Sequence, residues 1–274
     1  MKKNLSKAGV YLALITVCLV TNIPVLSMIG TAFKPRSETL STKGMFTLHP
    51  TTDNFWHVLT GTSFARSLIN TIIIAFIVTV LCVAVSAMAG YALSRCKGRA
   101  FGGYTLFLLI LQMLPAMLIM IPLYVTLSKF HLVDTHFSLI LIYTAINLPF
   151  GIWTLKGFFD SVPLELDEAA MIDGSSWYTA YRKVILPFSL PGIVSVSVFT
   201  FMNVWNEYTI ASVFIQDKNL RTLSVGIRQF MMQNSTDWAS MSAAATISII
   251  PAIIMVIFAQ KYLVGGLLSG SVKG

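Results

Sequence analysis

The stretch "LELDEAAMIDGSSWYTAYRKVILPFSLPG", residues 164–192, separates two long apolar segments and concentrates charged and helix-forming residues. Just before it, Ser161 predicts the N-cap of a short helix, and Pro163 falls in the first turn, where its missing N–H is tolerated. Acidic side chains fill the early turns, where carboxylates complement the positive end of the helix dipole. We therefore expect a short helix that ends near Asp173.

A glycine and a serine pair follow this helix and predict a turn into a second helix. Gly174 permits a left-handed or sharply turned backbone, which a side chain would resist. Ser175 or Ser176 is suited to cap the second helix, and Pro187 is expected to end it. The stretch thus predicts a helix, a glycine turn and a second helix.

The composition of the whole chain is typical of an integral membrane protein. Of its 274 residues, 55% are hydrophobic and only 11% are charged, whereas soluble domains carry roughly 25% charged residues. A membrane helix needs about 20 consecutive, mostly apolar residues. Windows of that kind predict an all-α membrane protein with a single domain over residues 1–274 and spans near 9–33, 67–94, 103–127, 136–158, 188–214 and 240–264.

The placement of Lys and Arg predicts how the chain is oriented. If the six predicted spans alternate, the amino terminus, the short connector 95–99 and the loop 159–187 fall on one side, where basic residues are dense. By the positive-inside rule that side is cytoplasmic, with both termini. The formal net charge of +8 is spread over short connectors and forms no long basic face. It therefore indicates membrane topology, and we expect no nucleic acid partner.

Several chemical sites are missing from the sequence. Without a Gly-Lys dipeptide the chain has no Walker-type phosphate loop, and it has neither a Gly-x-Ser-x-Gly turn nor a Gly-x-Gly-x-x-Gly fingerprint. Its cysteines and histidines do not follow metal-ligand spacings. We therefore expect no catalytic, cofactor or metal site in this chain.

Polar residues recur at helical spacing in the fourth and fifth predicted spans. In the fourth, the stripe is formed by Thr144, Asn147, Gly151 and Thr154. Such groups are costly against lipid, so they either line a water-filled route or hydrogen-bond between helices. The candidates for lining a route are Asn147, Thr200, Asn203, Asn206 and Glu207. Glu207 is the one carboxylate predicted well inside a span. Because an ion-coupled carrier usually needs several such groups, this hypothesis is less favoured.

The charged loop has two physical interpretations. It could rest on the membrane surface as a linker, with Trp177, Tyr178 and Tyr181 as interface anchors. However, its first helix is acidic, whereas an anionic cytoplasmic leaflet attracts bases. The adjacent small residues Ala169 and Ala170 suit close insertion into a protein groove. We favour docking to a partner protein.

The loop also resembles a known family motif. Glu168-Ala169-Ala170, three residues, Gly174, nine residues and Val184-Ile185-Leu186-Pro187 are similar to the "EAA" loop of permease subunits of binding-protein-dependent ABC importers, with Val184 where the family has Ile. The segments VWNEYTIA (204–211), RTLSVGIRQF (221–230) and QKYLVGGLLSGSVKG (260–274) resemble the MalG-like carbohydrate-uptake branch.

The resemblance implies a fold, a function and a set of partners. The fold would be that of a type I ABC importer permease in the inner membrane, surrounded by lipid. A second permease, expected to be a different chain, would form the other half of the route. Two ATPase subunits would bind ATP and Mg²⁺, and an extracytoplasmic binding protein would deliver a carbohydrate. The residues implied to couple the chain to the ATPase are Glu168, Ala169, Ala170, Gly174, Leu186 and Pro187.

Two alternatives remain open at this point. The transported solute could be something other than a sugar, and a secondary carrier is the less favoured alternative. The prolines expected inside spans could act as hinges or as static kinks; they are Pro115, Pro122, Pro149 and Pro251.

Overall fold

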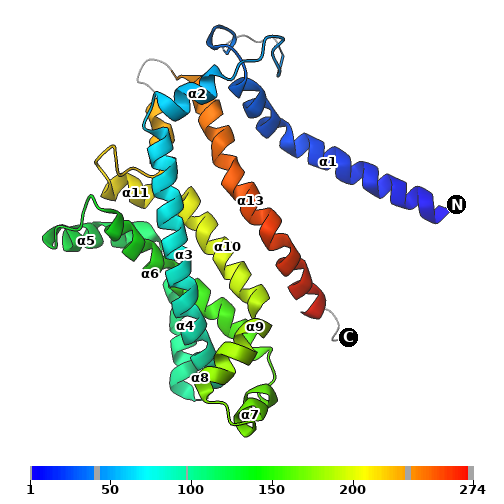
Figure 1. The fold of residues 1–274 in the computed structure, drawn as a ribbon, viewed down its shortest axis with the longest axis vertical. Helices are drawn as coiled ribbons and strands as arrows, with labels where there is room; N and C mark the ends of the chain where they lie inside the picture. The colour runs from blue at the N-terminus through cyan, green and yellow to red at the C-terminus, as the bar shows by residue number, and fades with distance from the viewer. Residues whose placement is uncertain (1, 40–43, 97, 232–235, 271–274) are drawn as a thin grey trace. The chain divides into compact units, whose positions relative to one another are not determined.

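The regular elements of the protein are helices. The computed structural model describes residues 2–39, 44–96, 98–231 and 236–270, and no β-strand is formed in these residues (Figure 1). The last four residues of the carboxyl-terminal segment quoted above lie outside the described residues. The architecture confirms the predicted all-α class.

Among the described residues, four helices are long and apolar enough to cross a membrane. They are α1 (Lys2–Ala32), α3 (Phe64–Arg95), α6 (His136–Asp160) and α13 (Trp238–Gly270). Two further helix pairs meet the same criteria together but are sharply bent. If each pair counts as one span, the described chain offers six, the number that the sequence predicts.

The shorter helices fill the connections between the long ones. They are α2 (Asp53–Thr60), α4 (Arg99–Met113), α5 (Ala116–Lys129), α7 (Glu165–Ile172), α8 (Trp177–Ala180), α9 (Leu186–Phe188), α10 (Leu190–Asn206), α11 (Thr209–Phe214) and α12 (Leu223–Gly226). Two 3-10 turns, Arg36–Glu38 and Ile227–Phe230, and a π-helical turn, Tyr181–Ile185, complete the elements.

The region expected as one span over 103–127 is broken. The axes of α4 and α5 meet at 95°, and Pro115 lies at the break with an extended backbone (ψ 122°). Proline disfavours a helical conformation in the residue before it, and Leu114 is extended too (ψ 125°). Three of the prolines expected inside spans, Pro122, Pro149 and Pro251, do lie within helices, whereas Pro115 separates two.

The described chain divides into two compact units, each of which takes part of α3 and part of α13. One contains residues up to 65 and residues 226–250, and the other contains residues 66–225 and the rest of α13. The single domain predicted over residues 1–274 stays a prediction.

The first unit joins the carboxyl end of α1 to the start of α13. Buried Asn54 of α2 donates to the carbonyls of Ala32, the last residue of α1, and of Lys34 at 2.9 and 2.8 Å, which gives partners to carbonyls that the helix leaves unpaired. Asp237 accepts from Ser240 and lies 3.4 Å from Arg36. Burial would raise the pKa of Asp237, but these hydrogen bonds and the Arg36 charge hold it below its usual range.

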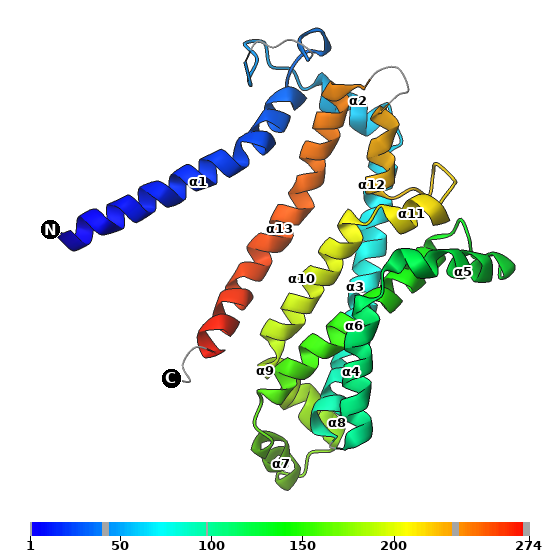
Figure 2. The same ribbon diagram turned by 180° about the vertical axis from the view of Figure 1, so that it is seen from behind.

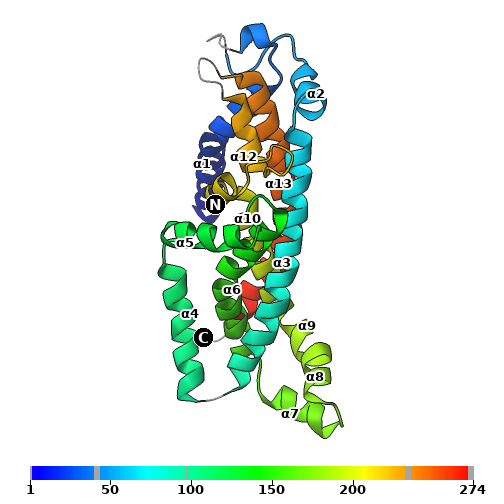
Figure 3. The same cartoon turned by 90° about the vertical axis from the view of Figure 1, so that its left-hand side faces the viewer.

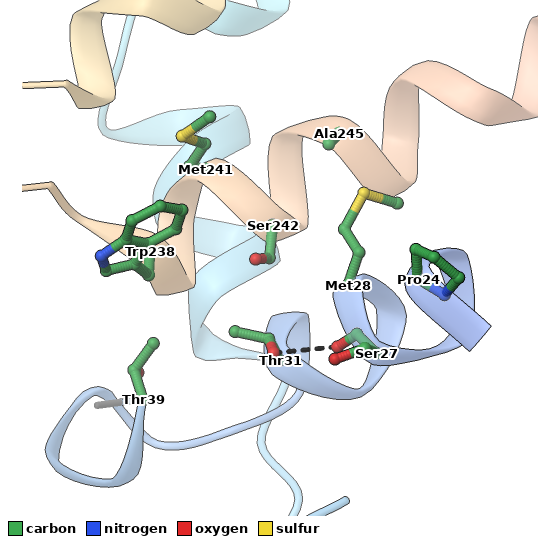
Figure 4. Close-up of a pocket in the computed structure, with 9 residues that line it drawn as sticks. All are labelled: Pro24, Ser27, Met28, Thr31, Thr39, Trp238, Met241, Ser242 and Ala245. Atoms are coloured by element: carbon green, nitrogen blue, oxygen red, sulfur yellow. Dashed lines mark hydrogen bonds between the residues drawn. The ribbon is translucent and has the colours of Figure 1, made fainter. Parts of the chain in front are cut away.

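A cavity of about 520 Å³ opens in this first unit (Figure 4). Its walls come from α1 and α13, with Thr39 at one side; they are formed by Pro24, Ser27, Met28, Thr31, Thr39, Trp238, Met241, Ser242 and Ala245. The hydroxyl of Thr31 is turned back onto the carbonyl of Ser27 at 2.9 Å. None of the candidate site residues lines this cavity.

The second unit is built around α6, which packs against α4, α10 and α11. Figure 2 shows α6 and α10 side by side. Gly151 of α6 lies directly against Cys82 and Ser86 of α3, where an added Cβ would collide with the Ser86 hydroxyl. A small residue at such a contact lets two membrane helices approach closely. Gly151, predicted as part of a polar stripe, therefore serves helix packing.

Candidate functional site

The acidic helix of the quoted stretch is α7, which lies at the end of the second unit where α3 and α6 terminate (Figures 1 and 3). It spans Glu165–Ile172, in agreement with the predicted end near Asp173. The predicted cap by Ser161 is wrong: its hydroxyl donates to the carbonyl of Phe158 at 2.7 Å. Ser161 therefore bonds to the last turn of α6, where the carbonyls of a helix lack partners within the helix.

Gly174 forms the predicted turn. Its φ of +84° lies in the left-handed region. The N–H of Gly174 bonds to the carbonyl of Met171, and that of Ser175 bonds to the carbonyl of Ala170, both at 3.0 Å. This pair of bonds is a Schellman motif, which closes a helix and redirects the chain. Nothing lies within 4 Å of where a Gly174 Cβ would be, so the constraint on this residue is its backbone angle.

The second helix begins as predicted but continues further. Ser176 caps it by accepting from the N–H of Thr179 at 3.3 Å. A π-helical turn then leads into α9, which runs through Pro187 to Phe188. Because Pro187 occupies the first turn of a new helical segment, its missing N–H does not end the helix. The chain bends by 75° only after Phe188.

The outer side of α7 is open to solvent. Glu168 and Ala169 are exposed, Ala170 is half-buried, and Ile172 is 86% exposed. Trp177 and Tyr178 of α8 are exposed close by in the sequence. Grouped exposed apolar side chains mark a surface that binds a protein partner or a membrane.

The two remaining predicted coupling residues, Leu186 and Pro187, have different surroundings. Leu186 is half-buried and packs against a core cluster of six buried residues: Ala87, Leu155, Phe159, Val162, Ile185 and Val196. Pro187 is exposed. Leu186 thus anchors the loop to α3, α6 and α10, while Glu168 and Ala169 face outward.

The inner side of α7 contains an ion pair that sequence reasoning missed. Asp167 is 1% exposed and accepts from Arg95 and from the hydroxyl of Tyr91, each at 2.7 Å. Arg95 counts in the sequence only as one of the basic residues in a short connector. No local pattern distinguishes buried Asp167 from the exposed acids Glu165 and Glu168 or identifies its partners.

The polar stripes meet at one direct hydrogen bond. The amide of Asn203 on α10 donates to Asn147 on α6 at 2.9 Å. Asn147 is buried, whereas Asn203 is exposed. Thr200 is fully buried and donates to the sulfur of Cys82 at 3.7 Å. Asn206 is exposed and bonds within its own helix to the carbonyl of Met202.

Glu207 interrupts the span expected over 188–214. α10 ends at Asn206 and α11 begins at Thr209. The carboxylate of Glu207 accepts from the N–H groups of Ile210 and Ala211 at 2.8 and 3.1 Å. It also accepts from Tyr143 of α6 at 2.7 Å. A carboxylate that binds free N–H groups stabilises the start of a helix, so the break leaves few backbone donors unpaired.

Comparison of the sequence with models of known protein families identifies the family of this chain. The model of binding-protein-dependent transport system inner membrane components matches residues 86–268, a region that includes α7 and both polar stripes. The chain belongs to this family. It is a permease of the ABC importer type, as the motif in the loop predicts.

Relatives and a solved structure agree with this assignment. The permease is 38% identical over 229 residues to the trehalose/maltose transport system permease protein MalG of Thermococcus litoralis, with 82% of each chain covered. It is 32% identical over 254 residues to the diacetylchitobiose uptake system permease protein DasC of Streptomyces coelicolor, covering 92% of this chain and 91% of the relative.

The fold matches a chain in the crystal structure of a bacterial ABC transporter involved in the import of the acidic polysaccharide alginate. The TM-score is 0.83 at 19% identity, with 96% of this permease and 98% of that chain covered.

Replacing Glu207 by Ala should destabilise the permease. The change leaves the hydroxyl of buried Tyr143 and two N–H groups of α11 without their acceptor, and an unpaired buried polar group costs about 1–3 kcal/mol. We expect a lower thermal unfolding midpoint for the purified full-length protein. The control is Asn206→Ala, on the same turn but exposed; equal midpoints for the two variants would contradict the capping role.

Proposed function

We propose that this permease forms half of the translocation pathway of an ATP-driven importer for a sugar or related carbohydrate. In this proposal the chain is not catalytic. Two separate ATPase subunits bind ATP and Mg²⁺, a second and different permease chain completes the pathway, and an extracytoplasmic binding protein delivers the solute. The chain lies in the inner membrane with both termini and the loop 159–187 on the cytoplasmic side.

The observation that carries the proposal is the presentation of α7. A capped helix of two turns exposes Glu168, Ala169 and Ile172 while its opposite side is anchored in the protein. The small side chain of Ala169 allows close approach, and Glu168 is placed to pair with a basic group of an ATPase. Gly174 sets the direction in which the chain turns after α7. These features support α7 as the element that docks into the ATPase.

For the pathway, the two stripes support different roles. Exposed Asn203 and Asn206 are available to a water-filled route, and amides suit a neutral solute that hydrogen-bonds, such as a sugar. Buried Thr200 and Asn147 bond within the protein and join helices. Three donors engage Glu207, which favours a capping role for this carboxylate over ion coupling in a secondary carrier.

Carbohydrate is the favoured solute class because named relatives serve trehalose and maltose or diacetylchitobiose. The alternative is an importer for another solute.

Docking through α7 is tested by purification of the tagged permease from its native membrane in mild detergent. We expect an ATPase subunit to co-purify and to hydrolyse ATP. The variant Glu168→Ala combined with Gly174→Val should lose the ATPase, because it removes the acid and strains the left-handed turn. Gly174→Asn alone should lose less, since Asn tolerates positive φ better than Val.

The matched control is Asp160→Ala, which removes an exposed acid from the end of α6, outside α7. It should retain the ATPase. A permease that purifies alone, or an ATPase that binds equally to every variant, would contradict docking through α7.

The solute class and the route are tested together by uptake. Cells with and without the permease gene are compared on a panel of labelled mono- and oligosaccharides, and we expect uptake of at least one to require the gene. For that sugar, Asn203→Leu should lower uptake at an unchanged yield of assembled complex. Normal uptake with a reduced yield would instead mean that Asn203 only joins α10 to α6. Loss of a non-sugar solute alone would contradict the carbohydrate assignment.

A further inference from the structure

We propose that Arg95 and Asp167 form the tie that transmits movement of α7 to the membrane helices α3 and α6. This inference rests on the proposed docking of α7 to an ATPase and assigns a role to two residues outside the family motif. Both are positioning residues, because neither is exposed on the proposed docking face.

The geometry places one guanidinium at the junction of three elements. The Nε of Arg95 lies 2.7 Å from Asp167 of α7. Its two terminal nitrogens donate to the carbonyls of Phe159, in the last turn of α6, at 3.1 Å and of Val162, just beyond it, at 3.3 Å. Arg95 is itself the last residue of α3. A displacement of α7 therefore acts on the ends of α3 and α6 through charge-assisted hydrogen bonds, which are short and directional.

A second contact from α3 holds the same carboxylate. Tyr91 lies one turn before Arg95 and donates to the other oxygen of Asp167 at 2.7 Å. The Tyr91 ring packs edge-on against Phe159 of α6, with centroids 5.7 Å apart, and against Tyr181 at 4.9 Å. Both carboxylate oxygens are thus held, so α7 can neither slide nor rotate on α3 without breaking a bond.

Burial distinguishes this pair from an ordinary surface ion pair. The Arg95 and Asp167 side chains are 7% and 1% exposed, and Asp167 is the buried residue of α7, whose eight residues are all described. A buried ion pair is seldom more stable than apolar residues of similar size. Its specific contribution here is a fixed direction and register for α7, which apolar packing by Leu166 alone does not define.

The pair Lys156–Asp160, with side chains 24% and 43% exposed, provides a less buried comparison on the same part of the molecule. It joins two residues of α6 four positions apart at 2.6 Å and connects no second element. Breaking it should not affect the transmission of movement.

The experiment follows movement in α3 while the ATPase works. Met88 lies about two turns before Arg95 and is 58% exposed. It is replaced by Cys and carries an environment-sensitive fluorophore, with Cys18 and Cys96 changed to Ser and with partner subunits that lack cysteine. The complete complex receives ATP and vanadate, and both the spectral shift and ATP hydrolysis before vanadate addition are measured.

We expect a shift in the wild-type background and in Lys156→Gln. Asp167→Asn should keep the bound ATPase and its hydrolysis but lose most of the shift, and Tyr91→Phe should lose part of it. If Asp167→Asn fails to assemble, the double variant Arg95→Leu with Asp167→Leu replaces it, since apolar residues restore packing without the directed bonds.

The outcomes separate this inference from the proposed function. A full shift in an assembled Asp167→Asn or double-leucine complex overturns the tie and leaves docking intact. Loss of the shift in Lys156→Gln as well also overturns it, because the effect would not be specific to the buried pair. A wild-type complex without an ATPase overturns both proposals.

Discussion

The rest of the structure depends on one constraint: polar groups withdrawn from water among apolar helices need partners, because an unpaired group there costs several kcal/mol. At the end of the second unit, Arg95 meets Asp167 and two carbonyls at the end of α6. Where α10 stops, Glu207 meets Tyr143 and the first N–H groups of α11. Each carboxylate thereby fixes the position of a short helix.

The carboxylates of Asp167 and Glu207 hold α7 and α11 in different surroundings. The side chains of α7 divide into a buried face that is anchored by Asp167 and an exposed face with Glu168 and Ile172. Such a helix can bind a partner without losing its place on α3 and α6. At the other site, Asn203 and Asn206 are exposed on the last turns of α10, just before the break. The family assignment makes a transport role for both features a natural interpretation.

Local features of the loop could be predicted from the sequence because they depend on neighbouring residues. The end of α7, the left-handed Gly174 and the Ser176 cap all follow from short-range hydrogen bonding. The prediction for Ser161 is wrong because a serine between two helices can bond to the end of the first or cap the start of the second, and here it bonds to the end of α6.

Long-range contacts could not be predicted in the same way. Asp167 and Arg95 are 72 residues apart. Taken alone, Asp167 predicts an acid that complements the helix dipole, and Arg95 predicts a basic residue on the cytoplasmic side. The break at Pro115 does not show in hydropathy, because α4 and α5 together are apolar enough for one span. The direct bond between Asn203 and Asn147 depends on how α6 and α10 pack, which a single stripe does not reveal.

Docking of α7 to an ATPase is tested most directly by photo-cross-linking from Ile172 in the native membrane. A photoreactive benzoylphenylalanine at this exposed position, and at exposed Leu106 of α4 as a control, reports which molecule lies against each helix. We expect a covalent adduct between position 172 and an ATPase subunit, and none from position 106. Adducts from position 172 with lipid alone would contradict it and would return the loop to the membrane surface.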